Sequence, residues 1–227
     1  NWFKKIELEE SWLPILSAKA KSYELDFLCT PTYCDSIKLL CDLKVPALKI
    51  ASPQVQANHV LLKQAAETKK TLLLSLGYSD YSDIFKAQII CSQAGNENLI
   101  FLHCISSYPA NPKDMQLKFI RTIRKMTNKP VGFSDHSLGT TMSVAAVTLG
   151  AAVIEKHVTT DKKHSGPDHA FAMEFKEFKS FIDQIKETEL ALGDGTRQNF
   201  LEEEIKLRHN VTLYMYSVEN IKKGEKF

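Results

Sequence analysis

Short apolar segments alternate with longer amphipathic segments along most of the chain, with a repeat of about 20–30 residues. This is the length of one strand–helix unit, so the pattern predicts a parallel α/β sheet whose faces are covered by helices. The predicted strands are Leu25–Cys29, Ala47–Ala51, Thr71–Leu76, Leu99–Ile105, Pro130–Phe133 and Ala151–Ile154. The predicted helices are Ser36–Leu43, Val60–Thr68, Asp80–Ala94, Leu117–Met126, Thr140–Leu149 and Phe175–Leu192.

Polar residues directly follow every apolar segment. The strand ends read CTPT, IASPQ, SLGYS, CISSYP, FSDHS and EKHVTT. In a (β/α) barrel all strand C-termini meet on one face, where reactive groups gather, whereas a flavodoxin-like sheet concentrates them at its switch point. No glycine-rich dinucleotide or nucleotide loop follows a strand. The polar strand ends therefore favour a TIM (β/α) barrel.

The domain organisation follows from the count of units. Six units do not close an eight-stranded barrel, so we expect a partial barrel over residues 1–195, beginning with a tail and one helix. Residues 196–211 are expected to be a linker. Residues 212–227 contain a β-type run and a turn-like IKKGE, which suggest the start of a truncated C-terminal domain. We therefore expect a fragment, with a complete open sheet as the alternative.

Composition indicates the cellular compartment and the classes of partner, rather than the reaction. Of the 227 residues, 44% are hydrophobic and 25% are charged, which suits a globular core, and the net charge of +2 gives no reason to expect nucleic acid or a membrane as a partner. The five cysteines form no C-x-x-C pair, and Cys29 and Cys104 lie in apolar runs, which favours free thiols in the cytoplasm. There is no signal-peptide pattern, and the most apolar window, Val144–Ile154, is too short to span a bilayer.

Several ordered motifs resemble the sialic acid synthase (N-acetylneuraminate synthase) family. They are LKIAS (Leu48–Ser52), LHCISSYPANPKD (Leu102–Asp114), GFSDHSLG (Gly132–Gly139), EKHVT (Glu155–Thr159) and GPDH (Gly166–His169). The resemblance runs from about residue 25 to 192, and IKKGE weakly resembles the entry to the family's C-terminal antifreeze-like domain.

The resemblance implies a transferase of nonulosonic acid biosynthesis. Such an enzyme condenses phosphoenolpyruvate with N-acetylmannosamine or a related amino sugar, and it releases phosphate as the nine-carbon sugar acid forms. It also implies small-molecule substrates and, for the full-length protein, a homodimer. Two alternatives stay open: another metal-dependent barrel aldolase or lyase, and a non-catalytic remnant of a synthase.

Two histidines are the candidate metal ligands. His136 and His157 end consecutive predicted strands, so a barrel would bring them side by side at its mouth. Two imidazoles with open positions suit Mn²⁺, Mg²⁺, Co²⁺ or Zn²⁺. The resemblance implies that both are catalytic and hold a divalent metal that polarises the sugar aldehyde, with Mn²⁺ preferred and Mg²⁺ or Co²⁺ as alternatives. His103, inside an apolar run, is interpreted as a core histidine, and His164 and His169 as loop residues.

Phosphoenolpyruvate is doubly anionic, so its pocket needs a fixed cation and short donors. Lys49 lies within an apolar strand and needs a counter-charge, and hydroxyls follow the neighbouring strands. By resemblance, the phosphoenolpyruvate-binding residues are Thr30, Lys49, Ser52, Ser75, Ser106 and Ser134.

The sugar is expected to contact Tyr108 and Asp168, which match family positions. Gln54 stands where the family usually has an acidic residue, two positions after the serine of the KI-x-S run. An amide cannot act as a base but can hydrogen-bond a hydroxyl, so we expect slow turnover or another sugar. Asp135 and Glu155 are candidates for fixing the imidazole tautomers, although an outward-facing role is the alternative for Glu155 and Lys156.

Overall fold

The computed structural model describes residues 8–197 and 200–226. Backbone contacts divide the chain into two units, Asn1–Ala191 and Leu192–Phe227. All the predicted strands and candidate site residues lie in the first unit, while residues 192–195 of the predicted barrel domain belong to the second. Among the described helices, none combines the length and the apolar character needed to cross a bilayer.

The first unit is built on five parallel strands that neighbour one another in sequence order. Each strand is joined to the next through one or more helices, as parallel pairing requires. The sheet curves strongly. This is evident from the ion pair across its concave side, where Lys49 on the first strand lies 3.0 Å from Glu155 on the fifth. This half-barrel confirms the predicted incomplete barrel. The strands are β1 Ala47–Ile50, β2 Thr71–Ser75, β3 Leu99–Cys104, β4 Val131–Asp135 and β5 Ile154–Lys156.

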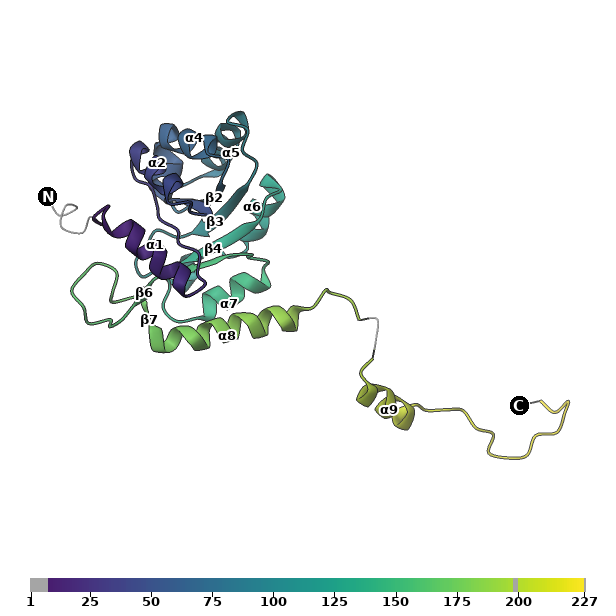
Figure 1. The fold of residues 1–227 in the computed structure, drawn as a ribbon. Helices are drawn as coiled ribbons and strands as arrows, with labels where there is room; N and C mark the ends of the chain where they lie inside the picture. Colours follow the sequence, from purple (N-terminus) through teal and green to yellow (C-terminus); the bar gives the residue numbers. More distant parts are fainter. Residues whose placement is uncertain (1–7, 198–199, 227) are drawn as a thin grey trace. The chain divides into compact units, whose positions relative to one another are not determined.

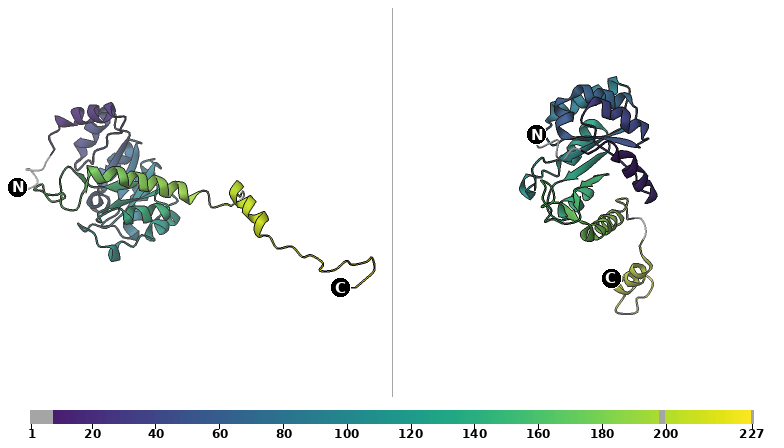
Figure 2. Two further views of the ribbon diagram at one scale, coloured as in Figure 1. Left: turned by 90° about the horizontal axis from the view of Figure 1, so that it is seen from below. Right: turned by 60° about the vertical axis from the view of Figure 1, so that its left-hand side comes forward.

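Helices cover the convex side of the sheet (Figure 1). Figures 1 and 2 show α7 and α8 side by side at the β5 end, where Thr140 Oγ1 donates a hydrogen bond to Gln184 Oε1 (2.8 Å). A second small sheet pairs β6 Val158–Thr159 with β7 Met173–Glu174. The helices are α1 Trp12–Ser22, α2 Cys34–Asp42, α3 Ser52–Ala57, α4 His59–Glu67, α5 Tyr81–Gln93, the 3₁₀ turn η2 Pro112–Asp114, α6 Phe119–Thr127, α7 Thr141–Thr148 and α8 Phe175–Leu192.

Strand alternation separates the core from the site. Leu48, Ile50, Leu72, Leu74 and Phe101 are fully buried beneath the helix layer. Burying such side chains contributes roughly 1.5–3 kcal/mol each to folding, which holds the helices on the convex side. The intervening residues point to the concave side and are free to be polar.

The six predicted helices form within two residues of their expected bounds, and five of the six predicted strands form, although β5 shares only Ile154 with the predicted Ala151–Ile154. The strand predicted at Leu25–Cys29 is wrong, because these residues pair with no strand in the described part of the chain. Their apolar side chains are not consistently buried, with Leu25 64% and Leu28 37% exposed. A run of apolar residues becomes a strand only where a neighbouring ladder accepts its backbone groups.

The second unit contains α9, Glu202–Val211, in most of the segment predicted as a linker. Three glutamates begin this helix and Arg208 with His209 ends it, which complements the helix dipole. The β-type run predicted after it forms no strand within residues 212–226. Its apolar side chains Leu213, Met215 and Val218 are 97–102% exposed, so nothing in the described structure pairs with or covers them.

Candidate active site

An ion pair joins the two edges of the sheet on its concave side. Lys49 Nζ lies 3.0 Å from Glu155 Oε2, and the hydroxyl of Ser134 donates to Glu155 Oε1 at 2.6 Å. Ser134 and Glu155 face each other in the β4–β5 register, so the ladder itself sets this contact. Thr30, Lys49 and Glu155 line a cavity of about 430 Å³. Glu155 is therefore the counter-charge expected for Lys49, and the outward-facing alternative for Glu155 is wrong.

Two of the predicted serines, Ser52 and Ser106, lie against Gly77. Ser52, in the first turn of α3 and 7% exposed, accepts a hydrogen bond from the Gly77 backbone N–H (2.9 Å). Ser106 also lies against Gly77. Ser75, at the end of β2, is 2% exposed, and its hydroxyl has no partner among the described residues. A buried hydroxyl without a partner costs about 1–3 kcal/mol, so this group fits one that awaits a ligand.

Gly77 leaves no room for a side chain, which yields a prediction. A Cβ added there would overlap Ser106 Oγ and lie 2.9 Å from Ser52 Oγ. We expect Gly77→Ala to turn both hydroxyls away and to lower the free energy of unfolding by about 1–3 kcal/mol, as overpacking does. Urea unfolding measures this loss.

The matched control for Gly77→Ala is the double-mutant cycle with Ser106→Ala, which removes the overlapping oxygen. In the Ser106→Ala background the alanine at 77 should cost clearly less unfolding free energy. Strictly additive losses would contradict the steric explanation.

The imidazoles of His136 and His157 lie together, with ring centroids 5.3 Å apart and an angle of 67° between the rings. His136 is 5% exposed, and its Nδ1 donates to the Ile105 carbonyl at 2.8 Å. A carbonyl only accepts, so this bond fixes the tautomer with Nε2 unprotonated, and Nε2 lies 3.5 Å from the Ser134 hydroxyl. Burial lowers the pKa of His136, which favours the neutral ring that a metal ligand requires.

Tyr108 and Phe171 enclose the two histidines. The Tyr108 ring centroid lies 4.2 Å from that of His136, and the Phe171 centroid lies 5.1 Å from that of His157. Phe171 is 5% exposed. Partial burial raises the pKa of Tyr108 to about 12, so its hydroxyl remains a donor at neutral pH. Phe171 has no polar group to draw attention in the sequence, and its place in the site was not predicted.

Asp168 and Gln54 occupy different parts of the site. Asp168 Oδ2 lies 3.8 Å from His157 Nδ1, and its carboxylate is 54% exposed, so it can accept a bond from a ligand. Gln54 lies in α3, and its side-chain oxygen is buried without a hydrogen-bond partner in the described structure. No side-chain hydrogen bond in the described chain joins Gln54 to Tyr108 or Asp168.

Asp135 does not fix an imidazole, so that prediction is wrong. It points to the convex side, where it pairs with Lys156 at 2.9 Å. Strand alternation is the reason, because Ser134 and His136 occupy the concave positions on either side of it. The tautomer of His136 is set instead by the backbone carbonyl of Ile105.

His103, His164 and Cys104 follow the predictions, whereas His169 and Cys29, which was expected to be a buried free thiol, are only partly buried. His103 is buried, with Nε2 2.7 Å from the Met115 carbonyl, and burial lowers its pKa. His164 is an exposed loop residue, but His169 is half-buried and its Nδ1 lies 2.7 Å from the Thr159 hydroxyl. All five cysteines are free; only Cys91 and Cys104 are buried.

The two imidazoles fit a divalent cation in the chemistry of their donors. His136 offers its unprotonated Nε2, which lies 3.5 Å from the Ser134 hydroxyl, and His157 lies beside it with its side chain 34% exposed. Within the described residues there is no group of three or more histidine, cysteine or acidic side chains that could hold a metal. The protein would thus supply two ligands and leave the other positions to water and substrate, which is typical of catalytic rather than structural sites.

Comparisons with known proteins identify a family and several relatives that this chain resembles. The NeuB family model matches residues 1–197. An N,N'-diacetyllegionaminic acid synthase from Campylobacter jejuni is 36% identical over 226 residues, which cover 99% of this chain and 67% of that protein. A pseudaminic acid synthase from the same species is 38% identical over 181 residues, covering 80% and 52%. The crystal structure of N-acetylneuraminic acid synthetase from Leptospira borgpetersenii has a TM-score of 0.84 and 32% identity, over 92% of this chain and 73% of that chain. The chain therefore spans only part of the length of each relative.

Proposed function

Because the chain belongs to the NeuB family, we propose that it condenses phosphoenolpyruvate with N-acetylmannosamine or a related amino sugar. A nine-carbon sugar acid forms and phosphate is released. The main support is the convergence of Lys49, the serine hydroxyls and the two imidazoles on the concave side of one sheet. An enol phosphate and an aldehyde need an anion-binding half and an electrophilic half side by side, and this site offers both.

The phosphoenolpyruvate half is assigned to the cation and the hydroxyls. The Lys49 ammonium neutralises part of the substrate's negative charge, and Ser52, Ser106 and Ser134 add short donors around it. The unpartnered hydroxyl of Ser75 gains a hydrogen-bond acceptor when the anion binds. Thr30, on the wall of the same cavity, extends the array.

The sugar half is assigned to the residues around the histidines. Polarisation of the open-chain aldehyde is the chemistry that a divalent cation, Mn²⁺ by preference, supplies when His136 and His157 hold it. Asp168 accepts a hydrogen bond from a sugar hydroxyl, while Tyr108 donates one. Phe171 excludes water from the side of His157 and keeps the reacting groups in a drier, lower-dielectric setting.

For the sugar acceptor, a class of amino sugars is proposed rather than a single compound. N-acetylmannosamine and the deoxy-diacetamido sugars that lead to legionaminic or pseudaminic acid all present an aldehyde and an N-acetyl group. The names of the relatives favour the latter two products. Gln54 hydrogen-bonds the acceptor as an amide, since it cannot act as a base.

The test is to incubate the protein with phosphoenolpyruvate, Mn²⁺ and a panel of these amino sugars, and to measure inorganic phosphate. We expect phosphate release that depends on the sugar and disappears when the metal is chelated. Cleavage of a keto acid without phosphate release would instead identify a lyase. No reaction with any sugar, with folding verified by circular dichroism, would identify a non-catalytic remnant.

A further inference from the structure

A buried ion pair stands directly behind the two histidines. Asp135 precedes His136 on β4, and Lys156 precedes His157 on β5. Asp135 and Lys156 form the last rung of the β4–β5 register, so each histidine is the first residue beyond the ladder. Because alternate strand residues face opposite sides, the ion pair lies on the convex side and the imidazoles on the concave side.

The contacts of this pair surround His136. Lys156 Nζ lies 2.9 Å from Asp135 Oδ2 and 2.5 Å from the Ser137 carbonyl, so it bonds to both neighbours of His136. Asp135 Oδ1 accepts from the backbone N–H and hydroxyl of Ser137 at 2.8 and 2.6 Å. Ser143, near the start of α7, donates to Asp135 Oδ2 at 2.6 Å. The loop that carries His136 is thus tied to the strand that carries His157 and to a helix.

The pair is dry, with side-chain exposures of 0% for Asp135 and 3% for Lys156. Taking two charges out of water costs several kcal/mol per ion, and apolar residues of similar volume often stabilise a fold as well or better. Net stability is therefore a weak reason to keep a lysine and an aspartate here. Positioning of the histidines is a stronger reason for the ion pair. Its bonds restrain the backbone on both sides of His136 and immediately before His157.

We propose that Asp135 and Lys156 form a positioning clamp that holds His136 and His157 at the separation a divalent cation requires. The inference rests on the proposed metal site, and neither clamp residue touches the metal or a substrate. It predicts that the ion pair contributes to metal affinity through geometry, as partners of ligating residues do.

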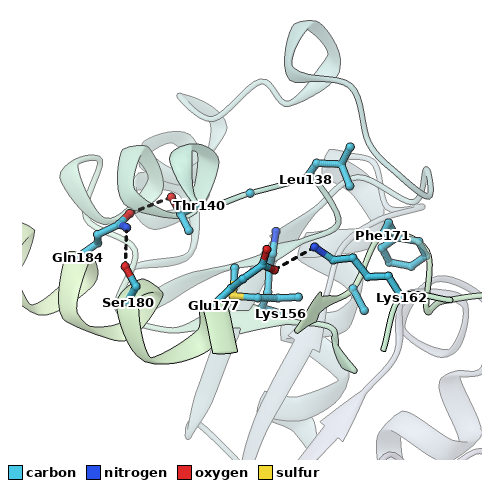
Figure 3. A pocket seen from close by; sticks show the side chains of 11 residues that line it. Leu138, Thr140, Lys156, Lys162, Phe171, Glu177, Ser180 and Gln184 are labelled. Atoms are coloured by element: carbon cyan, nitrogen blue, oxygen red, sulfur yellow. Dashed lines mark hydrogen bonds and ion pairs between the residues drawn. The ribbon is translucent and has the colours of Figure 1, made fainter. Parts of the chain in front are cut away.

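A cavity beside Lys156 makes the clamp accessible to experiment. It measures about 480 Å³ and lies between the loop before α7, β7 and α8 (Figure 3). Figure 3 shows Lys156 among the lining side chains, between the Thr140–Gln184 contact and the Lys162–Glu177 ion pair. Shortening Lys156 to alanine would join its vacated space to this cavity and open a route for a small amine.

The experiment titrates the whole protein with Mn²⁺ by electron paramagnetic resonance, which counts bound metal without requiring turnover. We expect Lys156→Ala to weaken Mn²⁺ binding about 10–100-fold. Propylammonium, the fragment removed by this substitution, should restore much of the affinity, while the uncharged 1-propanol should not. Lys162→Ala is the matched control, since Lys162 lines the same cavity but pairs with Glu177, and it should bind Mn²⁺ as the wild type does.

A second variant keeps the test valid if Lys156→Ala does not fold. Asp135→Asn with Lys156→Met removes both buried charges and should remain folded, as metal-free urea unfolding will show, yet bind Mn²⁺ weakly. Wild-type affinity in either folded variant, or equal restoration by 1-propanol, would overturn the clamp and leave the metal site standing. A wild-type protein that binds no Mn²⁺ would overturn the metal site and the clamp together.

Discussion

Replacing His157 with alanine is expected to slow metal-dependent condensation by about 10³-fold or more while the protein stays folded. The site offers two imidazoles, so the variant loses half of the ligands that the protein supplies. Several kcal/mol of transition-state stabilisation are at stake, and each 1.36 kcal/mol corresponds to tenfold in rate. The fold should tolerate the change, since the His157 side chain is 34% exposed and its nearest charged group, Asp168, is 3.8 Å away.

The measurement combines sugar-dependent phosphate release with Mn²⁺ titration. His164→Ala is the control, because His164 is exposed on the loop and bonds only to the Thr160 hydroxyl among its described contacts. The His164→Ala variant should retain both phosphate release and Mn²⁺ binding. Full turnover by the His157 variant, with one Mn²⁺ bound per chain, would remove His157 from the metal site.

Replacing Lys49 with methionine is expected to raise the KM for phosphoenolpyruvate about 100-fold or more. The methionine keeps the length of the side chain but removes the ammonium from a cavity whose ligand is an anion. Truncating one member of a desolvated charged contact costs about 2–5 kcal/mol in binding. Glu155 keeps its bond from Ser134 and is 37% exposed, so water can solvate its carboxylate and the fold should persist.

Initial rates of phosphate release over a range of phosphoenolpyruvate concentrations separate KM from kcat for this variant. Lys63→Met serves as the control, since Lys63 is 65% exposed on α4 and forms only a surface ion pair with Glu67. If the Lys49 variant kept the KM for phosphoenolpyruvate and raised the KM for the sugar instead, Lys49 would belong to the sugar-binding half of the site.

The sequence predicted most of the fold because its helices are locally consistent. Asp80, for example, begins α5 with a capping box, in which its side chain and that of Asp83 each bond the other residue's backbone N–H. β1, β2 and β3 end within one residue of the predicted ends, where the apolar runs stop, whereas β4 and β5 each continue two residues into polar sequence, to Asp135 and Lys156. The prediction of a strand at residues 25–29 failed for a physical reason. Apolar character does not reveal whether a neighbouring backbone is available for pairing.

The candidate site was predictable where the chemistry resides in one side chain. A lysine inside an apolar strand signals a partner, and Glu155 proved to be that partner. The role of Asp135 was mistaken because adjacency in sequence was read as adjacency in space, although neighbouring strand residues face opposite sides. The bond from His136 to the Ile105 carbonyl leaves no trace in residue types, since any residue offers a carbonyl.

The bridge between Lys49 and Glu155 has a thermodynamic consequence for ligand order. The Lys49 ammonium has three N–H donors and shares its charge with the Glu155 carboxylate, so an anion that binds it would weaken its attraction to Glu155. A Glu155 carboxylate held less tightly by Lys49 would be available to accept a hydrogen bond from the proposed sugar. Binding of the anion would then change the affinity for the sugar, and by reciprocity the sugar would change the affinity for the anion by the same factor.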